Sequence, residues 1–190
     1  MIHWKQKGSF GYRAFYKKKQ GFFVGIFLAA IIAQLIARSM TDWEAMKNVL
    51  TVSAILTVLP MANLASPLLV MLRIPSMSRE LYEKCRQSGQ EERLLYELVI
   101  TSKDLILPVD AVLIHPSGTI CYCPKKDIST KKAEEYLNGM LGKWKLNKNA
   151  RVITEERTFL KRLGTMPHAC GLSEDTEGTY VAELLKNLSI

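Results

Sequence analysis

Cysteine and histidine are the residue types in this chain that are best suited to bind a transition metal. Cys121 and Cys123 lie two residues apart on a predicted strand, so their side chains share one face. His168 and Cys170 have the same spacing, and the four side chains could form a tetrahedral zinc site. This spacing is not that of a zinc finger or ribbon, and cysteine is common in buried cores. We therefore predict no bound cofactor and keep these residues as metal-site candidates.

A small domain of helices and strands, predicted over residues 75–166, would position these residues. The apolar pattern predicts an α/β (α+β) domain with the order helix, antiparallel strands, helix, strand, helix. A flexible connection and a C-terminal helix are expected over 167–190. The predicted helices cover 77–88 with a continuation over 91–98, 129–145, 154–164 and 179–188, and the predicted strands cover 98–100, 105–107, 109–115, 119–123 and 151–153.

Two apolar runs precede this domain, over residues 21–37 and 49–74. Neither contains a charged residue except Arg73, and both are long enough to cross the hydrocarbon core of a bilayer. We therefore predict a transmembrane helical hairpin. The alternative for the first run is a cleaved signal peptide. However, the segment before it is long for a signal peptide, and Arg38 follows the run directly.

The charge distribution predicts how this hairpin is oriented. The formal net charge is +8. Residues 1–20 contain six Lys or Arg and no acid, the loop between the two runs is neutral, and residues 75–190 are nearly balanced. Because Lys and Arg stay on the cytoplasmic side, both termini are predicted to be cytoplasmic, at the plasma membrane. The basic arm over residues 1–20 would then be an interfacial helix or a disordered tail.

The second apolar run is irregular, with Pro60, Asn63, Ser66 and Pro67 inside it. Proline kinks a helix, and such kinks are tolerated in bilayers when neighbours satisfy the freed carbonyls. We expect a kinked hairpin in which Gln34 hydrogen-bonds Asn63. The alternative, a polar functional site at membrane depth, lacks an ionisable residue.

One segment of the soluble domain, DAVLIHPSGTICYCPK over residues 110–125, resembles the central hairpin of the nuclease-related domain. This domain is a membrane-associated branch of the restriction-endonuclease-like fold. Its pattern is an aspartate, a strand, a glycine-containing turn, a second strand and then Glu-x-Lys. The resemblance covers residues 78–165, and its specific part is the β-hairpin segment over residues 110–125.

The resemblance implies a metal-dependent nuclease with Asp110 and Lys125 as catalytic candidates. Two carboxylates would hold Mg²⁺, and the lysine would activate water. Cys123 stands at the second carboxylate position, and a thiol is a poor ligand for a hard cation. Glu97 or Asp127 would have to replace it. The resemblance therefore implies a degenerate nuclease.

The whole chain also resembles a family of membrane proteins of Gram-positive bacteria. Some of them carry the label O-linked N-acetylglucosamine transferase-like. The sequence has no tetratricopeptide repeats and no nucleotide-sugar motif. A soluble part of about 115 residues is also short for a glycosyltransferase.

These observations predict a non-enzymatic, membrane-anchored cytoplasmic adaptor. Its partners would be the bilayer and another protein at the membrane, with nucleic acid unlikely because the basic excess is confined to the arm. One alternative is a membrane-tethered nuclease. Another is a small accessory subunit of a membrane complex.

Overall fold

The computed structural model describes residues 5–102, 105–125, 127–167, 171–172 and 174–190. The chain forms two compact units. One, called here the hairpin unit, is Ala14–Pro75. The other, called the α/β unit, combines Ser76–Ile190 with the described residues up to Arg13.

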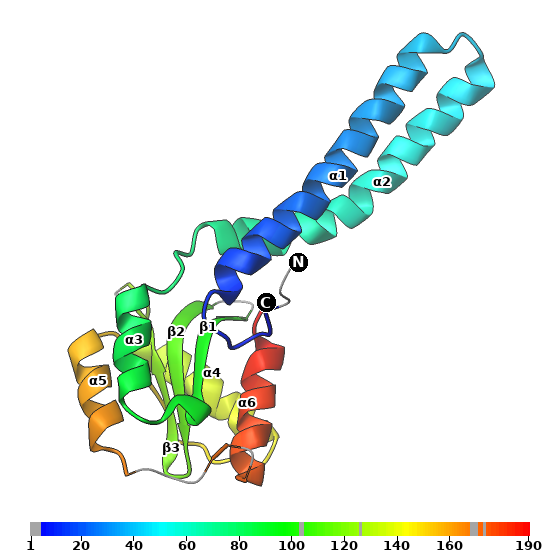
Figure 1. Cartoon of the computed structure of the whole chain (residues 1–190). Helices are drawn as coiled ribbons and strands as arrows, with labels where there is room; N and C mark the ends of the chain where they lie inside the picture. The colour runs from blue at the N-terminus through cyan, green and yellow to red at the C-terminus, as the bar shows by residue number, and fades with distance from the viewer. Residues whose placement is uncertain (1–4, 103–104, 126, 168–170, 173) are drawn as a thin grey trace. The chain divides into compact units, whose positions relative to one another are not determined.

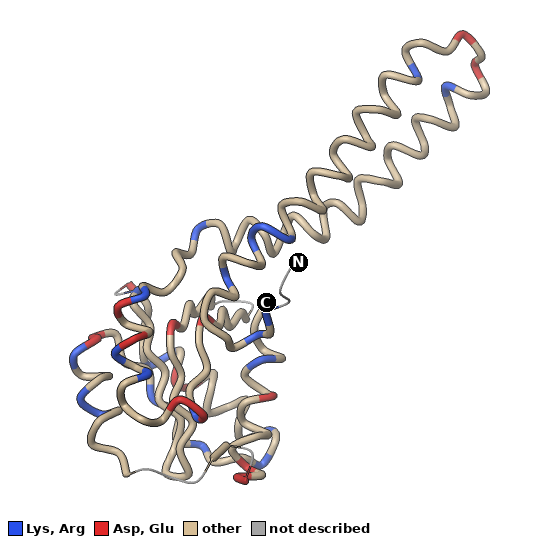
Figure 2. The backbone as a smooth tube through the Cα atoms, viewed as in Figure 1, with Lys and Arg blue, Asp and Glu red and all other residues tan. Residues whose placement is uncertain are grey.

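Two long antiparallel helices make the hairpin unit: α1 (Tyr12–Met40) and α2 (Glu44–Leu72), of 29 residues each. Each is about 43 Å long at 1.5 Å per residue, against a hydrocarbon core of about 30 Å. Figure 2 shows that the middle of both helices carries no charged residue. Their most apolar windows are only 0% and 11% buried. Both helices are thus long and apolar enough to cross a membrane, and neither is a buried core helix.

The polar residues of the hairpin unit pair differently from the prediction. Gln34 donates from Nε2 to Oγ of Ser53 at 3.2 Å, whereas Asn63 is exposed. The predicted Gln34–Asn63 bond is therefore wrong, because the antiparallel register places an earlier residue of α2 opposite Gln34. Helix α2 continues through Pro60 and Pro67, and Figure 1 shows it changing direction in its second half.

The basic arm also differs from the prediction. Its described part up to Arg13 packs in the α/β unit and is not a disordered tail. Lys7 donates from Nζ to the carbonyl of Ser189 at 2.7 Å, and Gly8 forms a β-bridge with Tyr96. The predicted boundary at residue 20 is thus displaced, since α1 begins at Tyr12 and the unit boundary follows Arg13.

A mixed four-stranded sheet with the order β1-β2-β3-β4 forms the centre of the α/β unit. The strands are β1 (Leu94–Thr101), β2 (Ile106–His115), β3 (Gly118–Tyr122) and β4 (Ala150–Ile153). The first three are antiparallel, and β4 lies parallel to β3. The prediction of antiparallel strands before the second helix agrees with β1 to β3, and the parallel direction of β4 was not predicted. Helix α4 connects β3 to β4 as a crossover, and a crossover makes parallel neighbours.

Helices cover both faces of this sheet. Helices α4 (Thr130–Lys143) and α6 (Thr176–Leu188) pack on one face, and α3 (Arg79–Gln87) and α5 (Glu156–Thr165) pack on the other (Figure 1). The unit is thus a three-layer α/β/α arrangement with a separate apolar core on each face.

Several boundaries differ from the prediction. The helix predicted to continue over 91–98 is a 3₁₀ turn, η1 (Glu91–Arg93), followed by β1. Serine at 129 caps α4 as predicted, accepting from the N–H of Lys132. Ser78 rather than Ser76 caps α3, and Thr154 does not cap α5.

Both edges of the sheet are occupied by other parts of the chain. Gly8 and Ser189 form bridges with residues of β1. At the β4 edge, Asn138 bonds the N–H and the carbonyl of Ala150, and Glu134 accepts from the N–H of Val152. Exposed strand edges invite pairing with another chain. These contacts therefore disfavour strand addition by a partner.

Candidate functional site

A buried cluster of three charged residues joins the start of α1 to the first two strands. In this cluster, called the Arg13 cluster, Nη1 of Arg13 lies 2.5 Å from Oδ1 of Asp110. Its Nη2 donates to the carbonyls of Leu98 and Val109 at 3.0 and 2.7 Å. Arg13 and Glu97 are 0% exposed and Asp110 is 7% exposed. The fork-shaped guanidinium suits this set of converging oxygens.

Glu97 binds the two places where the chain leaves and re-enters the α/β unit. Its Oε2 accepts from the backbone N–H of Arg13, and its Oε1 accepts from the N–H of Met77, both at 2.9 Å. The residues between them, Ala14–Pro75, are the hairpin unit. One carboxylate therefore holds together two points of the chain that are more than sixty residues apart.

The strand backbone is distorted where this carboxylate lies. Glu97 has φ 54°, a left-handed conformation that is rare for residues other than glycine. Its neighbours Tyr96 and Leu98 pair normally with Ala111 and Val109 of β2. Such a conformation costs on the order of 1–3 kcal/mol and persists only where the surroundings over-determine it. Here the surroundings are the two N–H donors to Glu97.

The electrostatics of Asp110 are a balance of opposing effects. Burial raises the pKa of its carboxyl, the charge and hydrogen bond of Arg13 lower it, and the nearby Glu97 carboxylate raises it, with a net shift upward. The arginine is thus the group that favours the charged form of Asp110, against the effects of burial and of Glu97.

The nuclease candidates are not assembled as the resemblance implied. Asp110 is engaged by Arg13, and Lys125 is exposed beyond the end of β3. Cys123, at the second carboxylate position, is buried. Asp127 is exposed. Glu97 does lie opposite Asp110, but its two oxygens accept backbone N–H groups instead of facing an open cation position.

The metal candidates are only partly covered by the structure. Cys121 and Cys123 are 0% exposed and belong to the core under α4 and α6. His168 and Cys170 lie outside the described residues. Within the residues that the structure describes, no group of three or more His, Cys, Asp or Glu could hold a metal ion. The four-ligand zinc site stays a prediction.

Burial makes the core thiols poor nucleophiles. It raises the pKa of Cys85 and of Cys121 to about 12, and only a thiolate reacts or binds metal readily. We expect Cys85, Cys121 and Cys123 to resist iodoacetamide at pH 8 in a folded Cys170→Ser variant and to react after denaturation. Mass spectrometry of the alkylated protein measures this. Rapid labelling of the folded variant would contradict the buried positions.

Cys85 and Cys121 also give the folded state a pH dependence. In the unfolded chain they ionise near the ordinary pKa of 9.0, whereas in the folded chain they stay protonated until about pH 12. The free energy of unfolding is therefore expected to fall as pH rises above about 9, at a rate of up to roughly 1.4 kcal/mol per pH unit for each thiol. Denaturation at pH 8 and 10 measures it. A variant with Cys85→Ala and Cys121→Ala should lose most of the difference.

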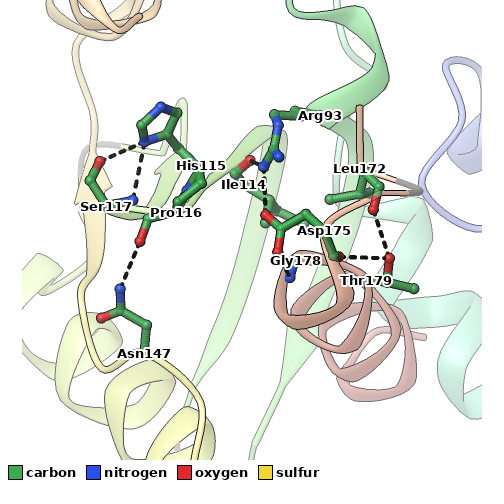
Figure 3. A network of polar contacts seen from close by, with 10 residues as sticks. All are labelled: Arg93, Ile114, His115, Pro116, Ser117, Asn147, Leu172, Asp175, Gly178 and Thr179. Atoms are coloured by element: carbon green, nitrogen blue, oxygen red, sulfur yellow. Dashed lines mark hydrogen bonds and ion pairs between the residues drawn. The ribbon is translucent and has the colours of Figure 1, made fainter. Parts of the chain in front are cut away.

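A second polar network fixes the turn between β2 and β3 to the start of α6 (Figure 3). Arg93 donates from Nη1 to the carbonyl of Ile114 at 3.1 Å and to Oδ2 of Asp175 at 3.0 Å. Asp175 in turn caps α6 by accepting from the N–H of Gly178. In the turn, Nδ1 of His115 accepts from the N–H of Ser117.

The cavity beside this network is small. Its volume is about 40 Å³, and its lining includes His115, Asn147 and Asp175. A water molecule needs about 10–15 Å³ of such space, so the cavity fits one or a few waters and no organic substrate. Asn147, one of its lining residues, donates from Nδ2 to the carbonyl of Pro116 at 3.1 Å. We interpret this network as structural.

A larger opening lies on the helical surface of the α/β unit. It has a volume of about 280 Å³ and is called here the Trp144 groove. Two exposed aromatic residues dominate it, Trp144 at 66% and Tyr180 at 58% exposure. The lining residues come from the end of α4 with its following loop and from α6: Trp144, Leu146, Tyr180, Glu183, Leu184 and Asn187. Exposed aromatic residues of this kind are typical of contact surfaces.

Comparison with known proteins gives no relative: no family model, curated protein or solved structure significantly matches the chain. The two resemblances drawn from the sequence are therefore untested and stay predictions.

Neither the role of Arg13 in the buried cluster nor the position of Trp144 in the groove was predicted from the sequence. Arg13 was treated as one more cation of the arm, although it is the one arginine among five lysines there. The guanidinium suits buried pairs better than an ammonium does, so this was an available signal. Trp144, between two lysines, was a second available signal for a surface site.

Proposed function

We propose that this protein is a non-enzymatic, membrane-anchored adaptor whose α/β unit stands on the cytoplasmic side of the plasma membrane. The hairpin unit would span the bilayer, and the α/β unit would bind another protein chain there. The orientation follows from the charge asymmetry of the flanking segments.

The Arg13 cluster is the observation that carries this proposal. The buried polar side chains of β1 and β2 bind the two segments of the α/β unit that flank the hairpin unit in the sequence. Arg13 engages Asp110, and Glu97 accepts from the N–H groups of Arg13 and Met77. Breaking this arrangement to bind Mg²⁺ would leave a buried guanidinium without its carboxylate, which is costly.

A nuclease assay separates this proposal from the enzymatic alternative. We expect the purified full-length chain to leave DNA and RNA intact in the presence of Mg²⁺ or Mn²⁺. A Lys125→Ala variant should behave in the same way. Metal-dependent cleavage that disappears in the Lys125→Ala variant would contradict the adaptor and favour the nuclease.

A second candidate function, an accessory subunit of a membrane complex, is favoured by one observation. Asn63 is exposed on α2 among mostly apolar residues, and an amide in lipid is satisfied by a neighbouring helix. A native-gel band that contains only copies of this chain after gentle detergent extraction would count against it.

A further inference from the structure

The charged residues of the hairpin unit lie at its two ends, and the two ends differ in charge. The end with the loop between α1 and α2, called here the loop end, carries two cations and two acids: Arg38, Asp42, Glu44 and Lys47. The other end, called here the basic end, carries cations only: Lys17, Lys18, Lys19 and Arg73. Figure 2 shows this difference along the two helices. The formal charge is therefore +4 at the basic end and zero at the loop end.

A hydrogen bond joins the two helices at the basic end. Nζ of Lys17 donates to the carbonyl of Ile74 at 2.6 Å, just beyond the last turn of α2. Arg73, the residue before this carbonyl, is thereby held close to the lysines of α1. Lys18 and Arg73 are exposed, and neither belongs to a salt bridge within the described part of the chain. These two cations are therefore available to an anion from outside the chain.

The spacing of charges along α1 indicates the depth of the basic end in a bilayer. Lys19 and Arg38 flank the uncharged part of α1. At 1.5 Å per residue they are about 29 Å apart along the helix, close to the thickness of a hydrocarbon core, about 30 Å. Tyr16 precedes the lysines, and Trp43 is 67% exposed at the loop end. Tyr and Trp are enriched at the two membrane interfaces, so a spanning hairpin would hold the basic end at the level of the lipid headgroups.

We propose that the basic end binds anionic phospholipids through the headgroup phosphate. This inference rests on the proposed function, in which the hairpin unit spans the bilayer. The guanidinium of Arg73 can donate two N–H groups to one phosphate, and the ammonium of Lys18 adds a further charged donor. The headgroup of a zwitterionic lipid brings its own ammonium to this surface, so its net attraction to four cations is weaker.

The apolar surface beside the cations selects a lipid over a soluble anion or an acidic protein. Phe22 and Phe23 follow Lys19 within four residues and are 68% and 42% exposed. A ligand that satisfies both features carries an anionic group next to an apolar chain. A phospholipid has this structure, whereas inorganic phosphate and an acidic protein segment would leave the exposed phenyl rings without an apolar partner.

Lipid quenching beside each end of α1 tests the proposal. A Gly21→Cys variant of the full-length chain, in a Cys170→Ser background whose other three thiols are buried, would carry a fluorophore two residues after Lys19. A Cβ at Gly21 has no neighbour within 4 Å. The vesicles would be phosphatidylcholine with a small fraction of either brominated phosphatidylglycerol or brominated phosphatidylcholine, whose bromines quench the fluorophore. We expect the brominated anionic lipid to be enriched at this reporter at least about fivefold, the effect of one cation near an anionic surface.

The loop end provides the matched controls. A second reporter, Ile36→Cys, lies two residues before Arg38 at a position that is 54% exposed. The two brominated lipids should quench it equally, because the loop end has no net charge.

Charge reversal at each end separates a local effect from one of total charge. A variant with Lys18→Glu and Arg73→Glu brings the basic end to zero charge and should abolish the enrichment at the Gly21→Cys reporter. A variant with Arg38→Glu and Lys47→Glu changes the total charge by the same amount and should leave that enrichment intact.

Four results would overturn the proposal. These are equal quenching by both lipids at the Gly21→Cys reporter, equal enrichment at both reporters, enrichment that survives reversal of the basic end, and enrichment that is lost on reversal of the loop end. Quenching by brominated phosphatidylcholine shows separately that the reporters are in lipid. Quenching without enrichment would therefore refute anionic lipid binding and leave the membrane-anchored adaptor intact. Protection of Cys85 and Cys121 from alkylation shows that the α/β unit of each variant is folded.

Discussion

Replacing Arg13 with alanine is expected to lower the free energy of unfolding of the α/β unit by about 3–5 kcal/mol. The reason is that the change leaves the carboxyl of Asp110 buried without its cation and removes the donors to two strand carbonyls. Because whole domains are stable by about 5–15 kcal/mol, this is a large fraction of the total. Urea denaturation of the full-length chain in detergent, followed by alkylation of Cys85 and Cys121, measures the loss.

Arg79 provides a matched control. It pairs with Glu83 four residues away, but its side chain is 84% exposed. Since exposed ion pairs contribute about 0–1 kcal/mol, Arg79→Ala should change the stability little. A combined Arg13→Met and Asp110→Leu variant should recover part of the loss, because it removes the buried charge. Equal losses for Arg13→Ala and Arg79→Ala would show that the buried cluster does not stabilise the unit.

Placing one arginine in the middle of each long helix is expected to abolish stable membrane integration. Ala29 and Leu56 are exposed on α1 and α2 and lie near the centres of these helices. An arginine at the centre of a membrane helix costs about 2.5–3.5 kcal/mol on insertion scales. With Ala29→Arg and Leu56→Arg together, most of the chain should become extractable by alkaline carbonate.

The control for this experiment adds the same charge at the end of a helix. Ser39 follows Arg38 near the end of α1, where a cation reaches water easily. Ser39→Arg should therefore remain in the membrane fraction. If the double variant resisted extraction as well as Ser39→Arg does, the two helices would not be membrane spans.

The parts of the fold that local chemistry determines could be predicted from the sequence. The uncharged runs predicted both long helices, and Pro116-Ser117-Gly118 predicted the turn between β2 and β3. Gly118 has φ 145°, and a Cβ there would lie 2.5 Å from the carbonyl oxygen of Asn149. Glycine is required at this position for both reasons.

The parts that depend on distant residues could not be predicted in the same way. The strand β1 contains Glu97 among apolar residues. Taken by itself, this pattern favours a helix, which is why a helix was predicted over 91–98. The partners of Glu97, the N–H groups of Arg13 and Met77, lie 84 and 20 residues away in the sequence. The parallel position of β4 was available in principle, because a strand, a helix and a strand in that order favour parallel pairing.

For the candidate site, the sequence analysis named individual residues but did not predict which residues contact each other. Asp110 was identified as a catalytic candidate, but its burial was not predicted, and its ion pair with Arg13 joins residues 97 positions apart. A sequence pattern cannot show such a contact. It can show residue types that suit it, and here it offered one arginine within a lysine-rich segment.

Topology labelling in cells is the most direct test of the account. Two reporters, each with one added cysteine in a Cys170→Ser background whose other three thiols are buried, would be labelled with a membrane-impermeant maleimide. Met40→Cys marks the loop between α1 and α2, and Lys161→Cys marks the surface of α5; both positions are exposed. The account predicts that intact cells label the Met40→Cys variant only and that permeabilised cells label both. Labelling of the Lys161→Cys variant in intact cells would contradict the cytoplasmic placement of the α/β unit.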